Sequence, residues 1–294
     1  VCQDLICDLF NLSIEFMHGV NSATISIRFN PMKYQRKYIE LRGQRIWASE
    51  MKPRFRSGDA VVLLHGGMSQ SEGFDGRLTP AVKGFHVYSY DRAGHGRSPD
   101  QPGSFHFDFQ YKEAVAFLED VVKAPAHLIG SSDGGIISLL VAINRPDLIK
   151  TITVIGANYH YKAGMPPIKP WKPDDAERSK YLHFSPDEPE TLDKKIKKMT
   201  KIWNTEPKMT LKELRTIKTP TLVIAGDDDV ISLKHTNEIY EAIENSRLAI
   251  IPGASHAIDK DQPELLNQII RGFLLNHEYP STLRPVRRKQ SEVQ

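Results

Sequence analysis

The sequence predicts an α/β fold with a mostly parallel sheet flanked by helices. Short apolar runs that favour strands alternate with segments whose apolar residues recur at helical spacing. The run AVVLL at residues 60–64 is apolar throughout, as expected of a strand covered on both faces of a sheet. Glycine-rich or acidic stretches follow several of these runs, so the polar residues gather where strands end. The strands begin near residues 60, 85, 126, 151 and 221.

The first half of the chain supplies a hairpin and then three strands with their connections. Residues 37–50 alternate around Arg42-Gly43 and predict a β-hairpin at a sheet edge. The remaining elements of this half are a strand at 60–67, a strand that breaks into a glycine-rich loop at 85–98, a helix at 109–122 and a strand, turn and helix at 126–146.

The second half resumes the sheet after an interruption. Strands are predicted at 151–158, 219–229 and 247–258, and a final helix at 263–277 closes the domain. We therefore expect an N-terminal extension at 1–37, a core in two parts at 38–157 and 206–280, an insertion at 158–205 and a basic tail at 281–294.

The insertion predicts a helical lid. It holds six of the chain's 19 prolines, and its latter part ends in an amphipathic pattern. Because it follows a strand of the sheet, we expect it to lie over the strand ends, where open α/β sheets bind ligands. An ordinary helix with a solvated face is the alternative. The apolar stripe is Leu192, Ile196, Met199 and Trp203, and the lysines around it are Lys194, Lys195, Lys197, Lys198 and Lys201.

Charge and composition argue against several classes of binding partner. The 294 residues carry a net charge of +3, and the excess of cations lies in the tail, which we expect to be solvated. A neutral body argues against a nucleic-acid partner. No apolar run is long enough to cross a membrane. Cys2 and Cys7 have no metal-binding spacing, which predicts a reducing, cytoplasmic compartment and no metal site.

The stretch Gly130-Ser131-Ser132-Asp133-Gly134 matches G-x-S-x-G, the nucleophile elbow. A serine at this turn lies between a strand and a helix, in a strained conformation that exposes its hydroxyl. Only Ser132 has a glycine two positions away on both sides, so it is the candidate nucleophile rather than Ser131.

A serine hydroxyl needs a base to take its proton and a carboxylate to hold that base. In hydrolases with a nucleophile elbow the chain order is serine, acid, histidine. Three adjacent aspartates, residues 227–229, follow one predicted strand, and His256 follows the next. The sequence therefore offers the expected order at the ends of strands.

These motifs together resemble the α/β-hydrolase fold superfamily from about residue 38 to 278. The matching stretches are H-G-G at 65–67, DRAGHGRS at 91–98, GSSDGG at 130–135, GDDD at 226–229 and GASH at 253–256. The resemblance implies an eight-stranded type of sheet and no cofactor. It also implies that Ser132 is the nucleophile, His256 the base and Asp229 the acid, with Asp228 as the alternative acid.

The resemblance further implies an oxyanion hole made by backbone N–H groups of Asp133 and Gly67, with Met68 as the alternative to Gly67. The elbow is similar to that of valacyclovir hydrolase-like enzymes, in which the aspartate after the serine pairs with an amino group of the substrate. A hydrogen bond from Asp133 to nearby backbone is the alternative. We expect Met68, Asp133, Trp171 and Trp203 to contact substrate.

The sequence thus predicts a serine hydrolase that cleaves a small or medium carboxylic ester, lactone or thioester through an acyl-enzyme, as a monomer or homodimer. A carbon–carbon bond hydrolase and a cofactor-free perhydrolase would use the same triad. A ligand-binding receptor with a vestigial triad is the alternative from another class.

Overall fold

The computed structural model describes residues 34–53, 59–162 and 165–287. Cys2 and Cys7, the predicted N-terminal extension up to residue 33 and the last seven residues of the predicted tail lie outside the described residues.

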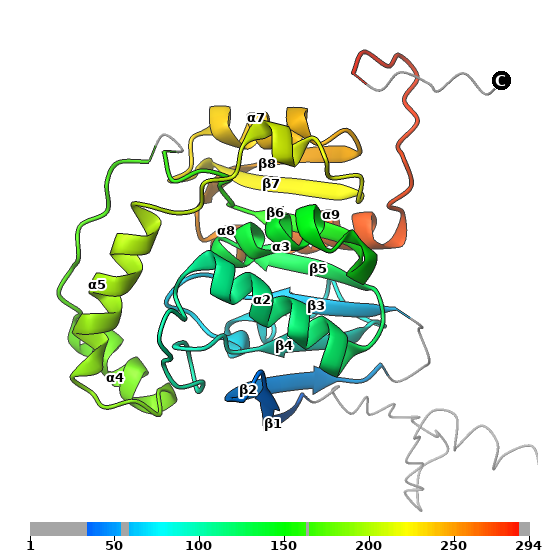
Figure 1. Ribbon diagram of the computed structural model, residues 1–294. Helices are drawn as coiled ribbons and strands as arrows, with labels where there is room; N and C mark the ends of the chain where they lie inside the picture. Colours follow the sequence, from blue (N-terminus) through cyan, green and yellow to red (C-terminus); the bar gives the residue numbers. More distant parts are fainter. Residues whose placement is uncertain (1–33, 54–58, 163–164, 288–294) are drawn as a thin grey trace, which may run out of the picture. The chain divides into compact units, whose positions relative to one another are not determined.

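One sheet of eight strands runs through the core, in the order β1-β2-β4-β3-β5-β6-β7-β8 (Figure 1). The pairs β1–β2 and β2–β4 are antiparallel, and the remaining pairs are parallel. The predicted α/β-hydrolase type of fold is confirmed. The strands are β1 (Gln35–Leu41), β2 (Gln44–Met51), β3 (Ala60–Leu64), β4 (His86–Tyr90), β5 (Ala126–Ser131), β6 (Ile149–Ile155), β7 (Thr221–Asp228) and β8 (Ser246–Ser255).

Burial along the strands follows their place in the sheet. All five residues of β3 are buried, because helices cover both faces of this central strand. Edge strand β1 instead mixes exposed, half-buried and buried residues. The hairpin between β1 and β2 turns at Arg42-Gly43, and both residues have positive φ.

Helices cover the sheet on both sides. In Figure 1, α2, α3 and α7 lie on the near side and α9 on the far side. Helix α9 is joined to the segment after β3 by Asn267, whose side chain accepts a hydrogen bond from the Ala81 N–H at 2.9 Å. The helices of four or more residues in the core are α2 (Phe107–Phe117), which continues into η2 (Leu118–Val122), α3 (Asp133–Asn144), α6 (Leu211–Leu214), α7 (Leu233–Ala242), α8 (Ile258–Asp261), α9 (Pro263–Leu275) and the 3-10 helix η1 (Ser71–Phe74); η3 (Pro146–Leu148) is a shorter 3-10 helix.

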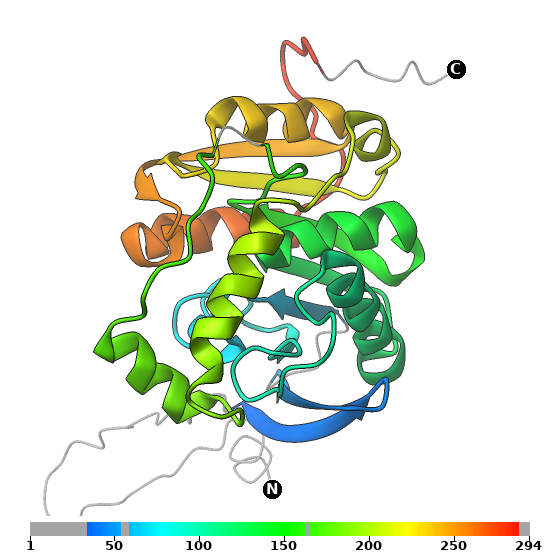
Figure 2. The same ribbon diagram turned by 60° about the vertical axis from the view of Figure 1, so that its left-hand side comes forward.

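The insertion between β6 and β7 carries two helices, α4 (Asp175–Phe184) and α5 (Thr191–Trp203). Figure 2 shows both in front of the edge of the sheet where the parallel strands end. A capping box starts α4, because Asp174 and Glu177 each accept the other's backbone N–H.

Helix α5 differs from its predicted pattern at Lys195. Leu192, Ile196 and Met199 are buried as expected, but the Lys195 side chain is also only 2% exposed. Its ammonium group donates to Asp187 at 2.6 Å and to the Gly94 carbonyl at 3.1 Å. Lysine can fill such a place because its stem is apolar and its charge meets partners at the far end.

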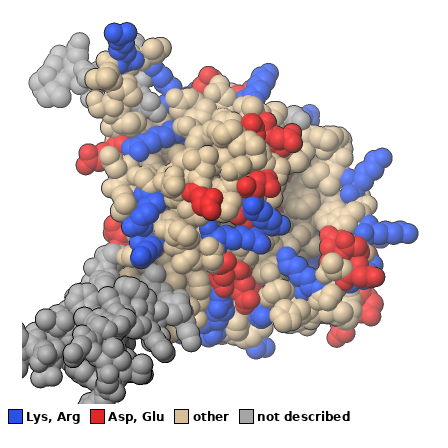
Figure 3. Space-filling view, turned by 180° about the vertical axis from the view of Figure 1, so that it is seen from behind, with Lys and Arg blue, Asp and Glu red and all other residues tan. Residues whose placement is uncertain are grey.

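The surface carries charges of both signs. On the face shown in Figure 3, Lys and Arg side chains are interspersed with Asp and Glu. In the predicted basic tail Arg287 departs from the expected solvation, since it donates to the Tyr240 carbonyl at 2.6 Å, near the end of α7. Among the helices of the described ranges, none is long and apolar enough to cross a bilayer.

Candidate active site

The turn between β5 and α3 has the backbone strain of a nucleophile elbow. Ser132 has φ 53° and ψ −117°, a conformation that side-chain-bearing residues rarely adopt. The backbone is too crowded for side chains on either side of it. A Cβ on Gly130 would lie 2.2 Å from the Gly134 carbonyl oxygen, and one on Gly134 would lie 2.0 Å from that of Leu64. The flanking glycines are therefore required by close approach of the chain.

Three side chains from separate strand ends meet at this turn. The Ser132 Oγ lies 3.1 Å from His256 Nε2, and His256 Nδ1 lies 2.8 Å from Asp229 Oδ1. Ser132 follows β5, Asp229 follows β7 and His256 follows β8. Because these strands are parallel, their carboxyl ends share one edge, and side chains far apart in the sequence come into contact there.

The imidazole of His256 is held in an environment that favours its charged form. Burial alone would lower the pKa of His256. The hydrogen bond and charge of Asp229, with a contribution from the charge of Asp133, outweigh that effect and raise the pKa above its ordinary value. A neutral His256 can accept a proton from Ser132, and the resulting imidazolium is stabilised by Asp229.

The three adjacent aspartates have different surroundings. The Asp229 side chain is fully buried and contacts His256, while its Oδ1 also accepts the Ile231 N–H at 3.0 Å. Asp227 accepts the Ala254 N–H at 3.1 Å and thereby joins the loops after β7 and β8. Asp228 is exposed. Of the two aspartates considered as the acid, only Asp229 is hydrogen-bonded to the imidazole.

The loop after β3 is held by buried polar groups. His65 Nε2 accepts the Arg92 N–H at 3.1 Å, and burial together with the charge of Arg92 keeps the pKa of His65 well below its ordinary value. The Arg92 guanidinium donates to the carbonyl of His65 and, at 3.0 Å, to that of Gly66. His65 is therefore a neutral brace for this loop.

Asp133 has a partner that neither sequence hypothesis included. Its Oδ1 accepts the Trp203 indole N–H at 3.0 Å, and its Oδ2 lies 4.0 Å from the Arg92 guanidinium. The residue is 1% exposed, and burial raises the pKa of Asp133 although Arg92 and Trp203 oppose that rise. A Cβ on Gly67 would lie 2.5 Å from the Trp203 ring and 2.6 Å from Asp133 Oδ2, so Gly67 is packed between the two side chains.

A cavity of about 580 Å³ opens beside Ser132 and His256, and Gly67 and Trp203 also line it. Asp133 is buried beneath this surface rather than exposed to the cavity. Met68 and Trp171 line a smaller neighbouring cavity of about 140 Å³, between the insertion and the core. The residues that line both cavities are Ser69, Gln70, Lys180 and Phe184.

Sequence reasoning missed two contributors to this site. Arg92 belongs to the DRAGHGRS stretch, where an arginine two residues after the end of a strand was the available signal, but its burial and its nearness to Asp133 depend on the folded loops. Lys180 carries no motif. In the described part of the chain, no group of three or more His, Cys, Asp and Glu side chains is arranged to hold a metal ion.

Comparison with known proteins identifies the family of this chain. Residues 61–269 match the model of the alpha/beta hydrolase family. The (E)-2-((N-methylformamido)methylene)succinate hydrolase of Acinetobacter baylyi is 24% identical over 243 residues, covering 74% of this chain and 90% of that protein. Serine hydrolase BPHL of Homo sapiens is 25% identical over 235 residues, covering 74% and 80%. The latter similarity supports the expected relationship to valacyclovir hydrolase-like enzymes.

A solved structure has the same fold as this chain. The crystal structure of a serine hydrolase involved in carbazole degradation, the CarC enzyme, superposes with a TM-score of 0.67 at 22% identity. It covers 83% of this chain and 99% of that one. With the family match across most of the chain and the fold in common, this protein belongs to the alpha/beta hydrolase family and is a hydrolase.

Proposed function

We propose that the protein is a serine hydrolase that cleaves a small or medium carboxylic ester through an acyl-enzyme, with Ser132, His256 and Asp229 as its triad. The observation that carries the proposal is the continuous pair of contacts, 3.1 Å from serine to histidine and 2.8 Å from histidine to aspartate, at a strained elbow. The serine hydrolase BPHL relative adds support.

The reaction uses His256 first as a base and then as an acid. It takes the Ser132 proton while Oγ attacks the ester carbonyl carbon, and it returns that proton to the alcohol oxygen as the carbon–oxygen bond breaks. A water molecule, deprotonated by the same imidazole, then attacks the acyl carbon. The carboxylic acid leaves and Ser132 regains its proton. Asp229 keeps the imidazole oriented and stabilises its charged form.

The oxyanion of the tetrahedral intermediate would be bound by the N–H groups of Asp133 and Gly67. Asp133 is the first residue of α3, so its N–H has no partner within the helix. The Gly66 carbonyl faces Arg92, and in a planar trans peptide the following Gly67 N–H points the opposite way. Gly67 lines the cavity beside Ser132 whereas Met68 lines the smaller one, which supports Gly67 as the second donor.

The insertion, residues 158–205, would act as the lid. Its Trp203 lines the cavity beside Ser132, while Trp171 lines the smaller one. We assign Trp203 to substrate contact and give the carboxylate of Asp133 the role of holding Trp203. A lid that excludes water strengthens the electrostatic interactions beneath it.

The test is hydrolysis of 4-nitrophenyl esters of graded acyl length. Wild-type protein should show a burst of nitrophenol equal to the enzyme concentration when deacylation is slower than acylation. Ser132→Ala should lose kcat/KM by about 10⁴-fold or more and show no burst, because the nucleophile is gone. Ser131→Ala is the matched control and should retain turnover within about tenfold, since the hydrogen bonds of the His256 imidazole in the described structure go to Ser132 and Asp229.

Full turnover by Ser132→Ala would overturn the proposal. Absence of turnover on every ester, with ligand-induced thermal stabilisation, would favour a receptor with a vestigial triad instead. If the protein cleaves only carbon–carbon bonds, or only forms peracids, the same triad would belong to a carbon–carbon bond hydrolase or to a cofactor-free perhydrolase.

A further inference from the structure

Some of the charged side chains that line the cavity beside Ser132 form ion pairs, and others do not. Three carboxylates and three cations line it: Glu72, Asp75 and Asp259, with Arg77, Lys180 and Lys260. Each carboxylate has an arginine partner, which are Arg97 for Glu72, Arg36 for Asp75 and Arg77 for Asp259. Two ammonium groups remain.

Lys180 and Lys260 are those two groups. Within residues 34–53, 59–162 and 165–287, no carboxylate lies within ion-pair distance of either ammonium. Glu177 is the acidic residue whose charge acts on Lys180, but its carboxylate already accepts the Trp171 indole N–H at 3.1 Å and the Asp174 N–H at 3.0 Å. The wall of the cavity therefore carries two ammonium groups that no ion pair of the described structure engages.

Both lysines line the cavity at exposed positions, so their ammonium groups are open to solvent and to a bound substrate. Partial burial, followed by the charges of Lys260 and Arg77, lowers the pKa of Lys180. The charge of Lys180 in turn adds to the burial and the other cations that lower the pKa of His65, on the loop after β3. An anion placed between these cations would relieve their mutual repulsion.

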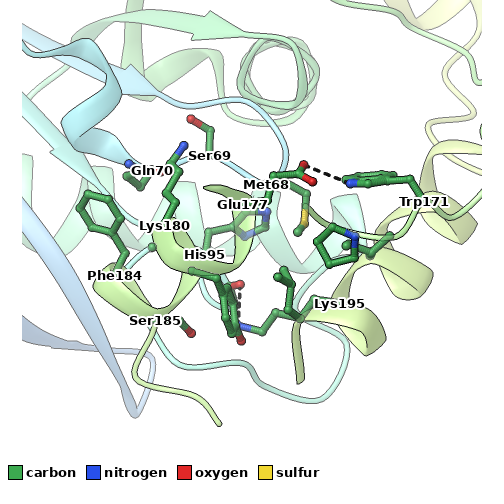
Figure 4. Close-up of a pocket in the computed structure, with 16 residues that line it drawn as sticks. Met68, Ser69, Gln70, His95, Trp171, Glu177, Lys180, Phe184, Ser185 and Lys195 are labelled. Carbon is green, nitrogen blue, oxygen red and sulfur yellow. Dashed lines mark hydrogen bonds between the residues drawn. The ribbon is translucent and has the colours of Figure 1, made fainter. Parts of the chain in front are cut away.

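The position of Lys180 suits it to bind such an anion. It belongs to α4 of the insertion, and it lines both the cavity beside Ser132 and the smaller one next to it. Figure 4 shows its side chain extending toward Ser69 and Gln70, which line both cavities too. A substrate lying with its ester at Ser132 would meet this ammonium where the two cavities adjoin.

We infer that Lys180, assisted by Lys260, binds a carboxylate on the substrate, so that the preferred esters are those carrying a second, free carboxylate, such as half-esters of dicarboxylic acids. This inference rests on the proposed ester hydrolysis. A lysine ammonium is a strong donor to a carboxylate when no other anion competes for it.

The test compares kcat/KM for anionic and neutral esters of matched shape. One pair places the carboxylate on the acyl side: 4-nitrophenyl hydrogen adipate and 4-nitrophenyl hexanoate. A second pair places it on the alcohol side: 4-acetoxybenzoate and phenyl acetate. Wild-type protein should favour the anionic member of at least one pair, and Lys180→Gln should reduce that preference by about tenfold, mainly through KM, because one charged hydrogen bond is lost.

Lys194→Gln is the matched control, since it removes one charge from an exposed position on α5 that lines neither cavity. It should leave the ratio of anionic to neutral ester unchanged. If wild-type protein prefers neither anionic ester, or if Lys180→Gln leaves the preference intact while neutral esters are still cleaved, the inference is wrong and ester hydrolysis stands.

A binding measurement separates the inference from the proposed function. Monoethyl adipate is titrated calorimetrically into Ser132→Ala and into the Ser132→Ala, Lys180→Gln double variant. Binding that weakens about tenfold in the double variant supports the carboxylate site even if no ester is turned over. Absence of binding, or equal binding by both proteins, contradicts it.

Discussion

The elbow and the insertion contribute to one cavity in different ways. At the elbow, Gly130 and Gly134 are required, because a Cβ at these positions would lie 2.2 Å and 2.0 Å from a backbone carbonyl oxygen. The insertion meets the same cavity through long side chains, Trp203 and Lys180, whose neighbours belong to distant segments. The proposed nucleophile can therefore be recognised from a local motif, whereas the residues proposed to contact substrate are brought to the cavity by contacts between distant segments.

The largest expected effect lies on the elbow side of this comparison. Asp229→Asn should lower kcat by about 10⁴-fold, because an amide cannot stabilise the imidazolium and favours the wrong tautomer of His256. Asp228→Asn is the control, since that side chain is exposed and should change kcat by less than about twofold. Equal losses in both variants would contradict the assignment of the acid.

The pH dependence of kcat/KM gives a second test of Asp229 as the acid of the triad. His256 must be neutral to act as a base, so kcat/KM should fall as the pH drops through the raised pKa of His256, and the acid limb should lie above the ordinary value for histidine. In Asp229→Asn the hydrogen bond and charge that raise this pKa are lost while burial remains. The limb should then move to lower pH, and a limb that stays in place would show that Asp229 does not set it.

An intermediate effect is expected where the insertion touches the elbow. Trp203→Phe keeps an aromatic ring but removes the N–H that Asp133 accepts. We expect kcat/KM on neutral esters to fall by about tenfold, because the carboxylate beside the oxyanion donors loses its anchor. Trp47→Phe removes an indole N–H that has no hydrogen-bond partner in the described structure, so it is the matched control.

If Trp203→Phe behaved like Trp47→Phe, the elbow would be independent of the insertion. The elbow would then serve only the chemical step, and the insertion only the contact with substrate. A loss of stability alone, measured by urea unfolding with unchanged kcat/KM, would also remove Trp203 from the positioning of Asp133.

The smallest effect on activity is expected inside the insertion. Lys195→Met removes a buried ammonium that joins Asp187 to the Gly94 carbonyl, and it should cost about 2 kcal/mol of unfolding free energy. Hydrolysis of neutral esters should change by less than about threefold. Lys197→Met, on an exposed position of the same helix, should leave stability within about 0.5 kcal/mol of wild type.

The sheet and the elbow could be predicted because their signals are local. Continuous apolar runs such as residues 60–64 identify buried strands, and the glycines around Ser132 identify the turn. The order of serine, aspartates and histidine along the chain then predicted that His256 and the aspartates lie at the same edge, where His256 Nδ1 is 2.8 Å from Asp229 Oδ1.

The remaining features depend on side chains meeting across the fold. Periodicity assigned Lys195 to the solvated face of α5, but a carboxylate and a carbonyl from other segments bury it. The partner of Asp133 is 70 residues away in the sequence. No local pattern distinguishes Lys180 from other lysines, because which lysines line a cavity depends on the folded chain.

Labelling with a fluorophosphonate probe, followed by mass-spectrometric mapping of the modified residue, tests the central claim most directly. The account predicts a single covalent adduct on Ser132 in wild-type protein and none in Ser132→Ala, with labelling that slows strongly when His256 is replaced by alanine. Modification of another serine at the same rate, or no adduct at Ser132 in folded protein, would contradict it.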